Sequence, residues 1–222
     1  MKYRYSVLLV IVGSFFMSGC SYLGQPTIED INCTKLAGKF TTHQEFKKCT
    51  NARKSYKVFK DKELLAKATP TNTKVKIDVS EQRARLYVDD KVAVDSPCTT
   101  GAKRKFEPNT KIYRDKRTPL GNFCVTEKIR DKRSSIFGKY YRGKTCVYKG
   151  DKRKYKGSKK GLRYEGASLA NWMRLTGSGI GLHASKYIKR YPGTNGCIRL
   201  PYHVSKTIFK YVRKGTPVIV SN

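Results

Sequence analysis

Apolar residues recur at one spacing in residues 42–68 and at a different spacing in the segments that follow. Between residues 42 and 68 apolar side chains recur at helical spacing, from Phe46 to Phe59. Thr42 and Glu45 stand at the start of this stretch in the form of a helix capping box. The next segment, VKIDVS, alternates apolar and polar residues as a half-buried β-strand does. The pattern therefore predicts a helical segment followed by strands.

Further strands and one helix follow in the same part of the chain. ARLYVDDKVAVDSP predicts two strands joined at Asp89 and Asp90, and TPLGNFCVTEKI predicts a turn that opens another strand. MRLTGSGIGLHAS is strand-like, with glycines where the backbone turns or approaches a neighbour closely. PYHVSKTIFKYVRKG is an amphipathic helix that stops at Gly215, and TPVIVS is a closing strand. We expect a β-rich α+β domain over residues 74–222.

The N-terminus carries a targeting signal. Cations in MKYRYS precede the apolar run SVLLVIVGSFF, which is too short to span a bilayer comfortably, and MSGC follows. We interpret residues 1–19 as a lipoprotein signal peptide, Cys20 as the lipidated residue and residues 20–73 as a tether with a helical appendage. An ordinary cleaved signal followed by a spare cysteine is the alternative. Ser21 is not acidic, which favours an outer-membrane anchor facing the periplasm.

The charge of the chain indicates an anionic partner. Lys and Arg number 48 against 16 Asp and Glu, which gives a formal net charge of +32. Such a charge attracts polyanions, and export to the cell envelope makes an anionic envelope polymer or lipid headgroups the expected partner and excludes nucleic acid. Residues 149–163 hold eight cations and one acid. This segment is either a solvated loop or a basic lid over a cleft, and we favour the lid.

The seven cysteines leave several pairings open. An exported protein keeps disulfides, and Cys33 with Cys49 is the pair we expect to be bridged. Cys98, Cys124 and Cys146 can supply another pair and one unpaired thiol, and the sequence does not decide which.

One cysteine stands in a stretch suited to chemistry. Cys197 lies in PGTNGCIRLP, and a cysteine nucleophile needs a base to form its thiolate. His183 lies in the glycine-rich GSGIGLHAS, whereas the other two histidines fall in the appendage and at the start of the last predicted helix. The alternatives are a disulfide-bonded cysteine and a structural histidine. Metal-ligand spacings such as Cys-x-x-Cys and a dinucleotide fingerprint are absent from the sequence, so we expect no metal and no cofactor.

Five segments occur in an order that points to one family. They are VKIDVSEQRARLYVDDKVAVDSPCTTG, TPLGNF, SGIGLHAS, GTNGCIRL and GTPVIV. In this order they resemble the catalytic domain of bacterial L,D-transpeptidases, the YkuD family. GTNGCIRL with its upstream histidine is the specific part, because it is similar to the family's Ser/Thr-x-Gly-Cys-x-Arg signature. The resemblance implies a sandwich of mixed sheets with one or two helices.

The resemblance also implies roles for site residues. Cys197 corresponds to the nucleophile and His183 to the base, and the carbonyl of Ala184 would orient the imidazole ring. The other implied residues are Gly196, which with Cys197 would supply oxyanion donors, Thr194 and Arg199, which would shape the cleft and hold substrate, and Asn195, which replaces a common His. Ala184 also departs from the family, which usually has Gly there.

The implied activity is acyl transfer on peptidoglycan stem peptides. His183 is expected to lower the effective pKa of Cys197, whose thiolate would attack a donor tetrapeptide and release D-Ala. Attack by an amine of a neighbouring stem would give a 3→3 cross-link. Water, a free D-amino acid or a protein lysine are alternative acceptors. A cell-wall-binding lipoprotein with an inactive site and a basic adhesin are alternatives outside this chemistry.

Overall fold

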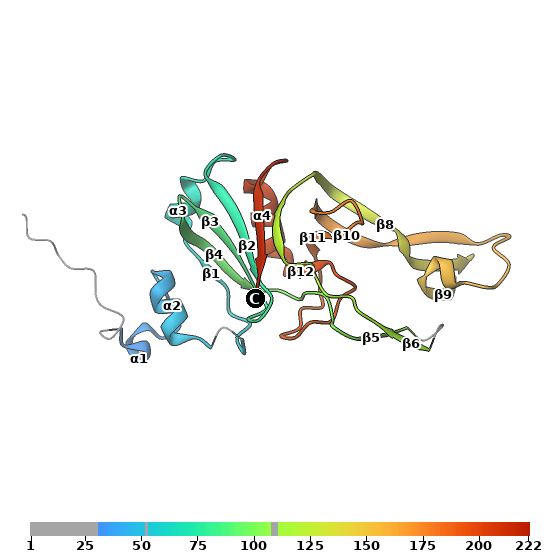
Figure 1. Ribbon diagram of the computed structural model, residues 1–222, viewed down its shortest axis with the longest axis horizontal. Helices are drawn as coiled ribbons and strands as arrows, with labels where there is room; N and C mark the ends of the chain where they lie inside the picture. Colours follow the sequence, from blue (N-terminus) through green and yellow to red (C-terminus); the bar gives the residue numbers. More distant parts are fainter. Residues whose placement is uncertain (1–30, 52, 108–110) are drawn as a thin grey trace, which may run out of the picture.

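The fold was examined in a computed structural model, which describes residues 31–51, 53–107 and 111–222. The predicted signal peptide and Cys20 lie outside the described residues. Two small helices stand at one end, two sheets with a helix form the middle, and a long β-arm projects at the other end (Figure 1). The predicted β-rich α+β class, with mixed sheets and few helices, is confirmed.

The first sheet is built around a meander. Its strand order is β1-β4-β3-β2-β13-β7. Antiparallel pairing joins β2 to β3 and β3 to β4, whereas β13 runs parallel to β2. Asp89 and Asp90, with φ of 45° and 62°, form the predicted turn between β3 and β4. The bounds are β1 (Phe59–Lys60), β2 (Thr73–Asp78), β3 (Arg83–Val88), β4 (Lys91–Pro97), β7 (Gly121–Cys124) and β13 (Pro217–Ser221).

The second sheet holds a parallel pair at one edge and a long arm at the other. Its order is β12-β11-β10-β8-β9, with β11 parallel to β12 and the other neighbours antiparallel. A separate hairpin joins β5 and β6. The bounds are β5 (Lys105–Glu107), β6 (Ile112–Arg114), β8 (Glu127–Arg142), β9 (Thr145–Asp151), β10 (Arg163–Arg174), β11 (Gly181–Ala184) and β12 (Ile198–Leu200). The predicted strand MRLTGSGIGLHAS contains the end of β10, a turn and the whole of β11.

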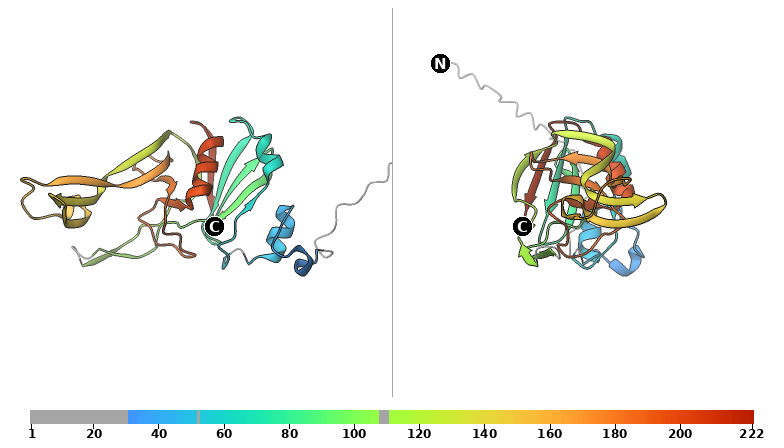
Figure 2. Two further views of the ribbon diagram at one scale, coloured as in Figure 1. Left: turned by 180° about the vertical axis from the view of Figure 1, so that it is seen from behind. Right: turned by 90° about the vertical axis from the view of Figure 1, so that its right-hand side faces the viewer.

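The helix α4 (Tyr202–Tyr211) packs against β10 and β11 and helps to join the two sheets into one core. Its buried residues Val204 and Ile208 are four apart and so lie on one helix face. They belong to one buried apolar cluster with residues of both sheets, including Leu86, Leu182 and Val218. Figure 2 shows α4 beside the first sheet. The predicted amphipathic helix and closing strand are therefore confirmed, and the helix ends four residues before Gly215.

The single helix predicted over residues 42–68 is wrong. The structure has α1 (Cys33–Leu36), α2 (His43–Cys49) and α3 (Lys62–Ala66), and among the described residues between α2 and α3 the chain turns at residues 53–54 and then forms β1. The capping box of Thr42 and Glu45 is present, so the start was correct. Thr50 then leaves the helical region, and Phe59 pairs with Asp95 as part of strand β1. Hydrogen bonding to the edge of a sheet, which periodicity does not register, replaces the helix.

The N-terminal segment is fixed to the sheets by buried charges. Arg83 is 0% exposed and donates to Asp95 at 2.7 Å and to the carbonyls of Ser55 and Lys57, each at 3.2 Å. His43, on α2, lies 2.8 Å from the other carboxylate oxygen of Asp95. A buried charge is stable only when it is paired, so this cluster ties residues 43–57 to the first sheet.

Only part of the cysteine prediction is correct. Cys33 and Cys49 form the expected disulfide, which joins α1 to α2. Cys98 is buried as a free thiol, and Cys124 and Cys146 are exposed free thiols. The second pair that we considered among these three is therefore absent from the described part of the chain.

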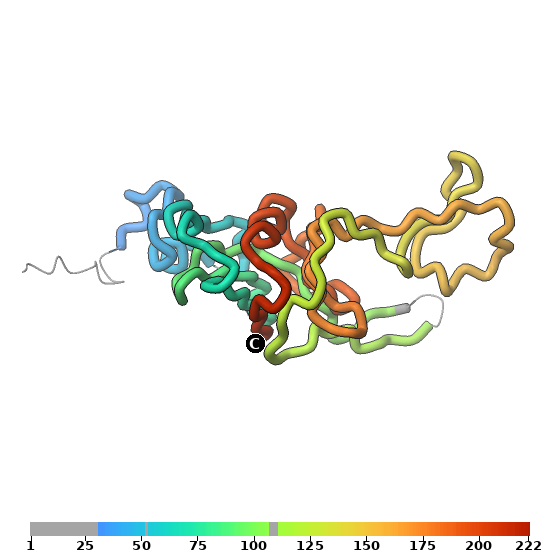
Figure 3. Tube along the Cα trace, turned by 90° about the horizontal axis from the view of Figure 1, so that it is seen from above, coloured from blue at the N-terminus to red at the C-terminus, as the bar shows by residue number. Residues whose placement is uncertain are grey.

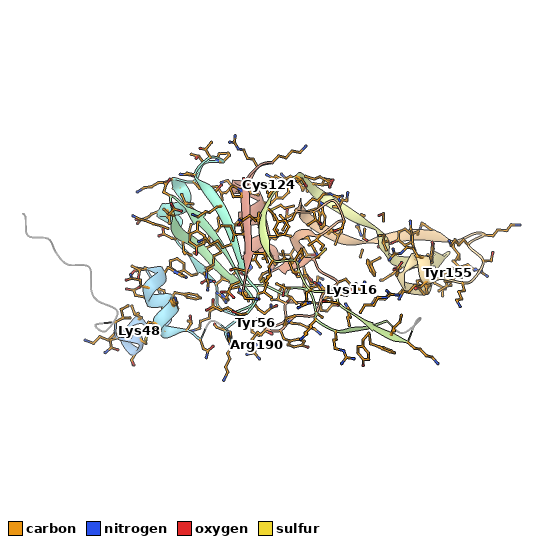
Figure 4. All side chains as sticks on the ribbon, viewed as in Figure 1. Lys48, Tyr56, Lys116, Cys124, Tyr155 and Arg190 are labelled. Atoms are coloured by element: carbon orange, nitrogen blue, oxygen red, sulfur yellow. A yellow bond between two sulfur atoms is a disulfide. The ribbon has the colours of Figure 1, made fainter. Side chains whose placement is uncertain are left out.

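Residues 149–163 lie at the outer end of the arm, which we define as residues 131–170. Arg163 is eleven residues along β10 from Arg174, which pairs with β11, so roughly 35 Å of strand separates the segment from the β11–β12 pair. Figure 3 shows the arm extending away from the core, and Figure 4 places Tyr155 near its outer end. The structure therefore does not place this segment beside Cys197, as the lid interpretation required.

Candidate active site

The parallel strands β11 and β12 bring the predicted residues to one face of the sheet. Their register sets His183 opposite Arg199 and Leu182 opposite Ile198. Leu182 and Ile198 are buried in the core, so the alternation of strand side chains places His183 and Arg199 on the other face. Cys197 immediately precedes β12 and stands two residues from Arg199, on that same face.

The hydrogen bond of His183 fixes which ring nitrogen is basic. Nδ1 lies 2.9 Å from the carbonyl oxygen of Ala184, and because a carbonyl only accepts, Nδ1 carries the proton. The expected contact with the Ala184 carbonyl is therefore present, and Nε2 is left with its lone pair. Burial lowers the pKa of His183 to about 4, the Ala184 hydrogen bond opposes this shift, and the charge of Arg199 adds to it. At neutral pH the imidazole is uncharged and able to take a proton.

Cys197 is a free, partly exposed thiol. Its sulfur lies 3.7 Å from the carbonyl oxygen of Gly179, in the turn between β10 and β11. Burial raises the pKa of the thiol, and a backbone hydrogen bond from Gly181 and the charge of Arg199 only partly oppose it. The expectation that His183 lowers this pKa is thus wrong for the resting site, in which no described hydrogen bond joins the sulfur to the imidazole. The resting pair is a neutral thiol and a neutral imidazole.

Arg199 provides a positive charge that the protein itself does not neutralise. Within the described residues its guanidinium has no ion pair and no hydrogen bond, although its backbone pairs with Thr99 at 2.9 and 3.0 Å. The side chain is half-buried, and burial lowers its pKa. A half-buried guanidinium without a partner is suited to a carboxylate, which it can bind through two parallel hydrogen bonds.

The loop before Cys197 differs from what the sequence analysis expected. Thr194 is 1% exposed; its hydroxyl donates to the Cys197 carbonyl at 2.6 Å and accepts from the Gly196 N–H at 3.1 Å. Thr194 therefore shapes the loop from inside and does not line the cleft. The Gly196 N–H is already used, so its predicted role as an oxyanion donor is not available in this arrangement. Asn195 is exposed and contributes no described hydrogen bond.

Gly196 has a backbone that other residues rarely adopt. Its φ is 109°, in the region that favours glycine, and its carbonyl accepts a hydrogen bond from the Thr118 hydroxyl at 2.8 Å. Thr118 comes from TPLGNF, and its hydroxyl also accepts from the Gly101 N–H at 2.8 Å. No role was expected for this threonine from the sequence. Its hydroxyl connects the loop that carries Cys197 to the segment before β7.

Trp172 is a further residue of the site that sequence reasoning missed, and it lies beside Gly181, one of the glycines expected at a close approach. The Trp172 ring lies 6.3 Å from the His183 ring, centroid to centroid, and forms one wall of the imidazole pocket. Its indole Nε1 is buried without a described hydrogen-bond partner. A Cβ at Gly181 would come within 2.9 Å of this indole and closer still to the Met173 carbonyl. The only available signal was that Trp172 is the single tryptophan of the chain.

Neither a metal-binding cluster nor a membrane-spanning helix is found within the described residues. No three His, Cys, Asp or Glu side chains there are grouped so that they could hold a metal ion. No helix in that part of the chain is long and apolar enough to cross a bilayer. The site thus consists of a thiol, an imidazole and a guanidinium, which together are suited to nucleophilic attack by sulfur on an acyl group next to a carboxylate.

Comparison with known proteins identifies one family model and a group of solved structures. The YkuD model, the L,D-transpeptidase catalytic domain, matches residues 72–220. Similar structures include L,D-transpeptidases from Mycobacterium smegmatis (17% identity, TM-score 0.47, 68% of this chain and 59% of that one) and Xylanimonas cellulosilytica (18%, 0.49, 68% and 60%). A mutant enzyme from Enterococcus faecium is 25% identical, with a TM-score of 0.43 over 68% and 50%. This chain therefore spans about half to three-fifths of their lengths, and no curated protein matches it.

Proposed function

Because the chain belongs to the YkuD family of L,D-transpeptidase catalytic domains, we propose that it is a cysteine acyltransferase acting on peptidoglycan stem peptides. The observation that carries this proposal is that His183 of β11, Arg199 of β12 and Cys197, the residue directly before β12, lie on one face of this strand pair. Three features support it. The thiol is outside any disulfide, the imidazole keeps a basic Nε2, and the guanidinium has no partner among the described residues.

In the first half-reaction a donor tetrapeptide acylates the enzyme. The Nε2 of His183 takes the thiol proton as the sulfur of Cys197 attacks the carbonyl carbon of the third residue, and a C–S bond forms. The N–H of Cys197 donates to the oxyanion. The C–N bond to the terminal D-Ala then breaks, and the imidazolium returns its proton to the leaving amine. Arg199 binds a carboxylate of the donor and so sets the position of the scissile bond.

In the second half-reaction an amine of a neighbouring stem peptide takes the acyl group. The amine attacks the thioester carbon, His183 accepts its proton, and the C–S bond breaks to release the thiol of Cys197. The product is a 3→3 cross-link. The neutral resting pair fits this route, because attack and proton removal then occur together and no thiolate has to be stored beforehand.

Mass spectrometry of the products tests the proposal. We expect the purified protein to convert a disaccharide-tetrapeptide into a dimer with loss of one D-Ala. A tripeptide product would assign hydrolysis, added D-amino acid in the stem would assign exchange, and attachment to a protein lysine would assign anchoring. An unchanged substrate would overturn the enzyme assignment and favour a wall-binding protein.

Covalent labelling locates the nucleophile. We expect a carbapenem to acylate the protein once, and the adduct to disappear in Cys197→Ala. The matched control is Cys124→Ala/Cys146→Ala, which removes both other exposed free thiols and should keep the adduct. An adduct that survives in Cys197→Ala would show that this residue is not the nucleophile.

The cellular location is a separate part of the proposal. The signal-like N-terminus supports an exported lipoprotein that is anchored through lipid on Cys20, with the outer membrane favoured. Metabolic labelling with an alkyne fatty acid should mark the full-length chain, and Cys20→Ser should abolish the label. Equal labelling of Cys20→Ser would refute the anchor.

A further inference from the structure

A second concave surface lies on the arm, outside the site described above. It is a cavity of about 340 Å³ formed by residues of β8, β9 and β10. Its charged lining residues are Arg133, Lys139, Lys149 and Glu165, and Phe137 contributes an apolar side chain that is 39% exposed. None of the roles assigned above uses these residues.

Two lysines of this cavity face each other across neighbouring strands. Lys139 of β8 pairs with Lys149 of β9 and, on its other side, with Glu165 of β10. Directly opposite residues of this kind have Cβ atoms about 4.5–5.5 Å apart, and like charges there destabilise the sheet. A lysine pair in this position therefore leaves a positive charge that an anion placed between the two ammonium groups would relieve.

Tyr141 and, to a smaller extent, Glu165 favour the charged form of Lys139 and raise its pKa, so the ammonium group stays protonated. Glu165 is already engaged by arginines, since it lies 3.9 Å from Arg133 and 3.4 Å from Arg163. The side chain of Lys149 has no ion pair and no hydrogen bond with another described residue. The arm as a whole carries thirteen Lys and Arg against three Asp and Glu. The cavity is thus the concave part of a strongly positive element.

The opposite face of the arm carries a cluster of tyrosine rings that stabilises the strands lining the cavity. Tyr148, Tyr140 and Tyr164 form the next cross-strand row, and alternation puts this row on the other face from the lysine pair. Their rings, together with Tyr155, pack with centroids 5.1–6.4 Å apart. Such aromatic packing stabilises the three strands far from the main core, so the backbone positions that carry the two lysines are fixed before a ligand arrives.

We propose that this cavity is a second binding site that takes carboxylate groups of peptidoglycan between Lys139 and Lys149. The choice of polymer rests on the function proposed above. The concave shape, the carboxylate of Glu165 and the exposed Phe137 favour a peptide-bearing strand, whose carboxylates enter singly, over a flat anionic membrane. Glu165 is nine residues along β10 from Arg174, roughly 30 Å. A polymer held there keeps its other stems near Cys197 and raises their effective concentration.

Sedimentation with purified peptidoglycan sacculi tests this site without any need for catalysis. All proteins carry Cys197→Ala, so that no acyl-enzyme forms. We expect K139Q/K149Q to lower the affinity for sacculi at least tenfold at low salt, and K156Q/K159Q to lower it less than twofold. The control removes the same charge from exposed positions of the same arm, outside the cavity. Thermal unfolding checks that both variants fold.

Three results would overturn the proposal. Equal losses in the two variants would assign binding to overall charge. Amidation of the carboxyl groups of the sacculi should lower the affinity of the protein with the unsubstituted arm to that of K139Q/K149Q for untreated sacculi. Undiminished binding to amidated sacculi would exclude the carboxylate as the ligand. A loss on anionic phospholipid vesicles without a loss on sacculi would assign the cavity to lipid. Failure of the proposed reaction would instead leave cavity-dependent binding to sacculi intact, so the two failures are distinguishable.

Discussion

The buried imidazole of His183 should make the protein less stable in mild acid, and the structure gives the size of the effect. The pKa of a histidine in the unfolded chain is near 6.5, and in the folded protein burial lowers the pKa of His183 to about 4. Between these values the unfolded state binds a proton that the folded state does not. The contribution of the neutral His183 to the free energy of unfolding is fully present above pH 6.5 and is lost as the pH falls toward 4. At about 1.4 kcal/mol per pH unit, the loss is about 3 kcal/mol.

The variant His183→Gln separates this contribution from that of other titrating groups. Gln keeps a polar side chain in the pocket but takes up no proton, so the variant should lose about 3 kcal/mol less than the parent between pH 7 and pH 4. The lowered pKa of Asp95 is common to both proteins, so its effect cancels in the comparison. Any change in stability at pH 7 caused by the substitution also cancels, because only the difference between the two pH values is compared.

Urea unfolding at several pH values provides the measurement. The free energy of unfolding is determined for both proteins at pH 7, 6, 5 and 4 with the Cys33–Cys49 disulfide intact. The difference in the free energy of unfolding between the parent and His183→Gln should change as the pH falls from 7 to 4 and should stay constant outside this window. Parallel curves from pH 7 to pH 4 would refute the buried, neutral state of His183 and, with it, the argument that Nε2 is available as a base.

Three other predictions concern neighbouring features. Gly181→Ala should lower the free energy of unfolding by about 1–3 kcal/mol, measured by urea, since its methyl group would overlap the Met173 carbonyl; full stability would show that the strands separate easily. The raised pKa of Cys197 means that alkylation by iodoacetamide should keep accelerating above pH 8, and a plateau near pH 7 would indicate a preformed thiolate. Replacing Cys33 and Cys49 by Ser opens a loop with a sequence separation of 16 and should reduce stability by about 3 kcal/mol, whereas an unchanged urea midpoint would contradict that.

The parts of the fold that sequence reasoning predicted correctly are those with a local signal. The turn at Asp89 and Asp90, the amphipathic helix and the closing strand each follow from periodicity and turn chemistry within a few residues. The family resemblance is confirmed by the match to residues 72–220. The failure over residues 42–68 has a non-local cause, because Phe59 satisfies its backbone against β4, which comes much later in the chain.

The residues of the site also fall into those that a local sequence signal reveals and those that depend on the assembled fold. Cys197 and His183 stand out by residue type and by glycine-rich surroundings, and the structure places them on one face of adjacent strands. The part played by Thr194 could not be read from its sequence position, since its hydroxyl turns inward to the Cys197 carbonyl. Likewise, the direction of the thiol pKa depends on burial, which is a property of the assembled sheets and not of the local motif.

The neutral resting pair limits the reactivity of Cys197 in the absence of substrate. Thiol–disulfide exchange requires a thiolate that attacks a disulfide, so the raised pKa of Cys197 makes its sulfur a slow nucleophile toward disulfides. Because the resting thiol of Cys197 is a poor nucleophile, its reactivity must arise when substrate is bound. A donor carboxylate at Arg199 would offset the positive charge that lowers the pKa of His183, so the imidazole would become a stronger base only when substrate is present. Under the proposed mechanism, one guanidinium would thus couple substrate binding to activation of the nucleophile.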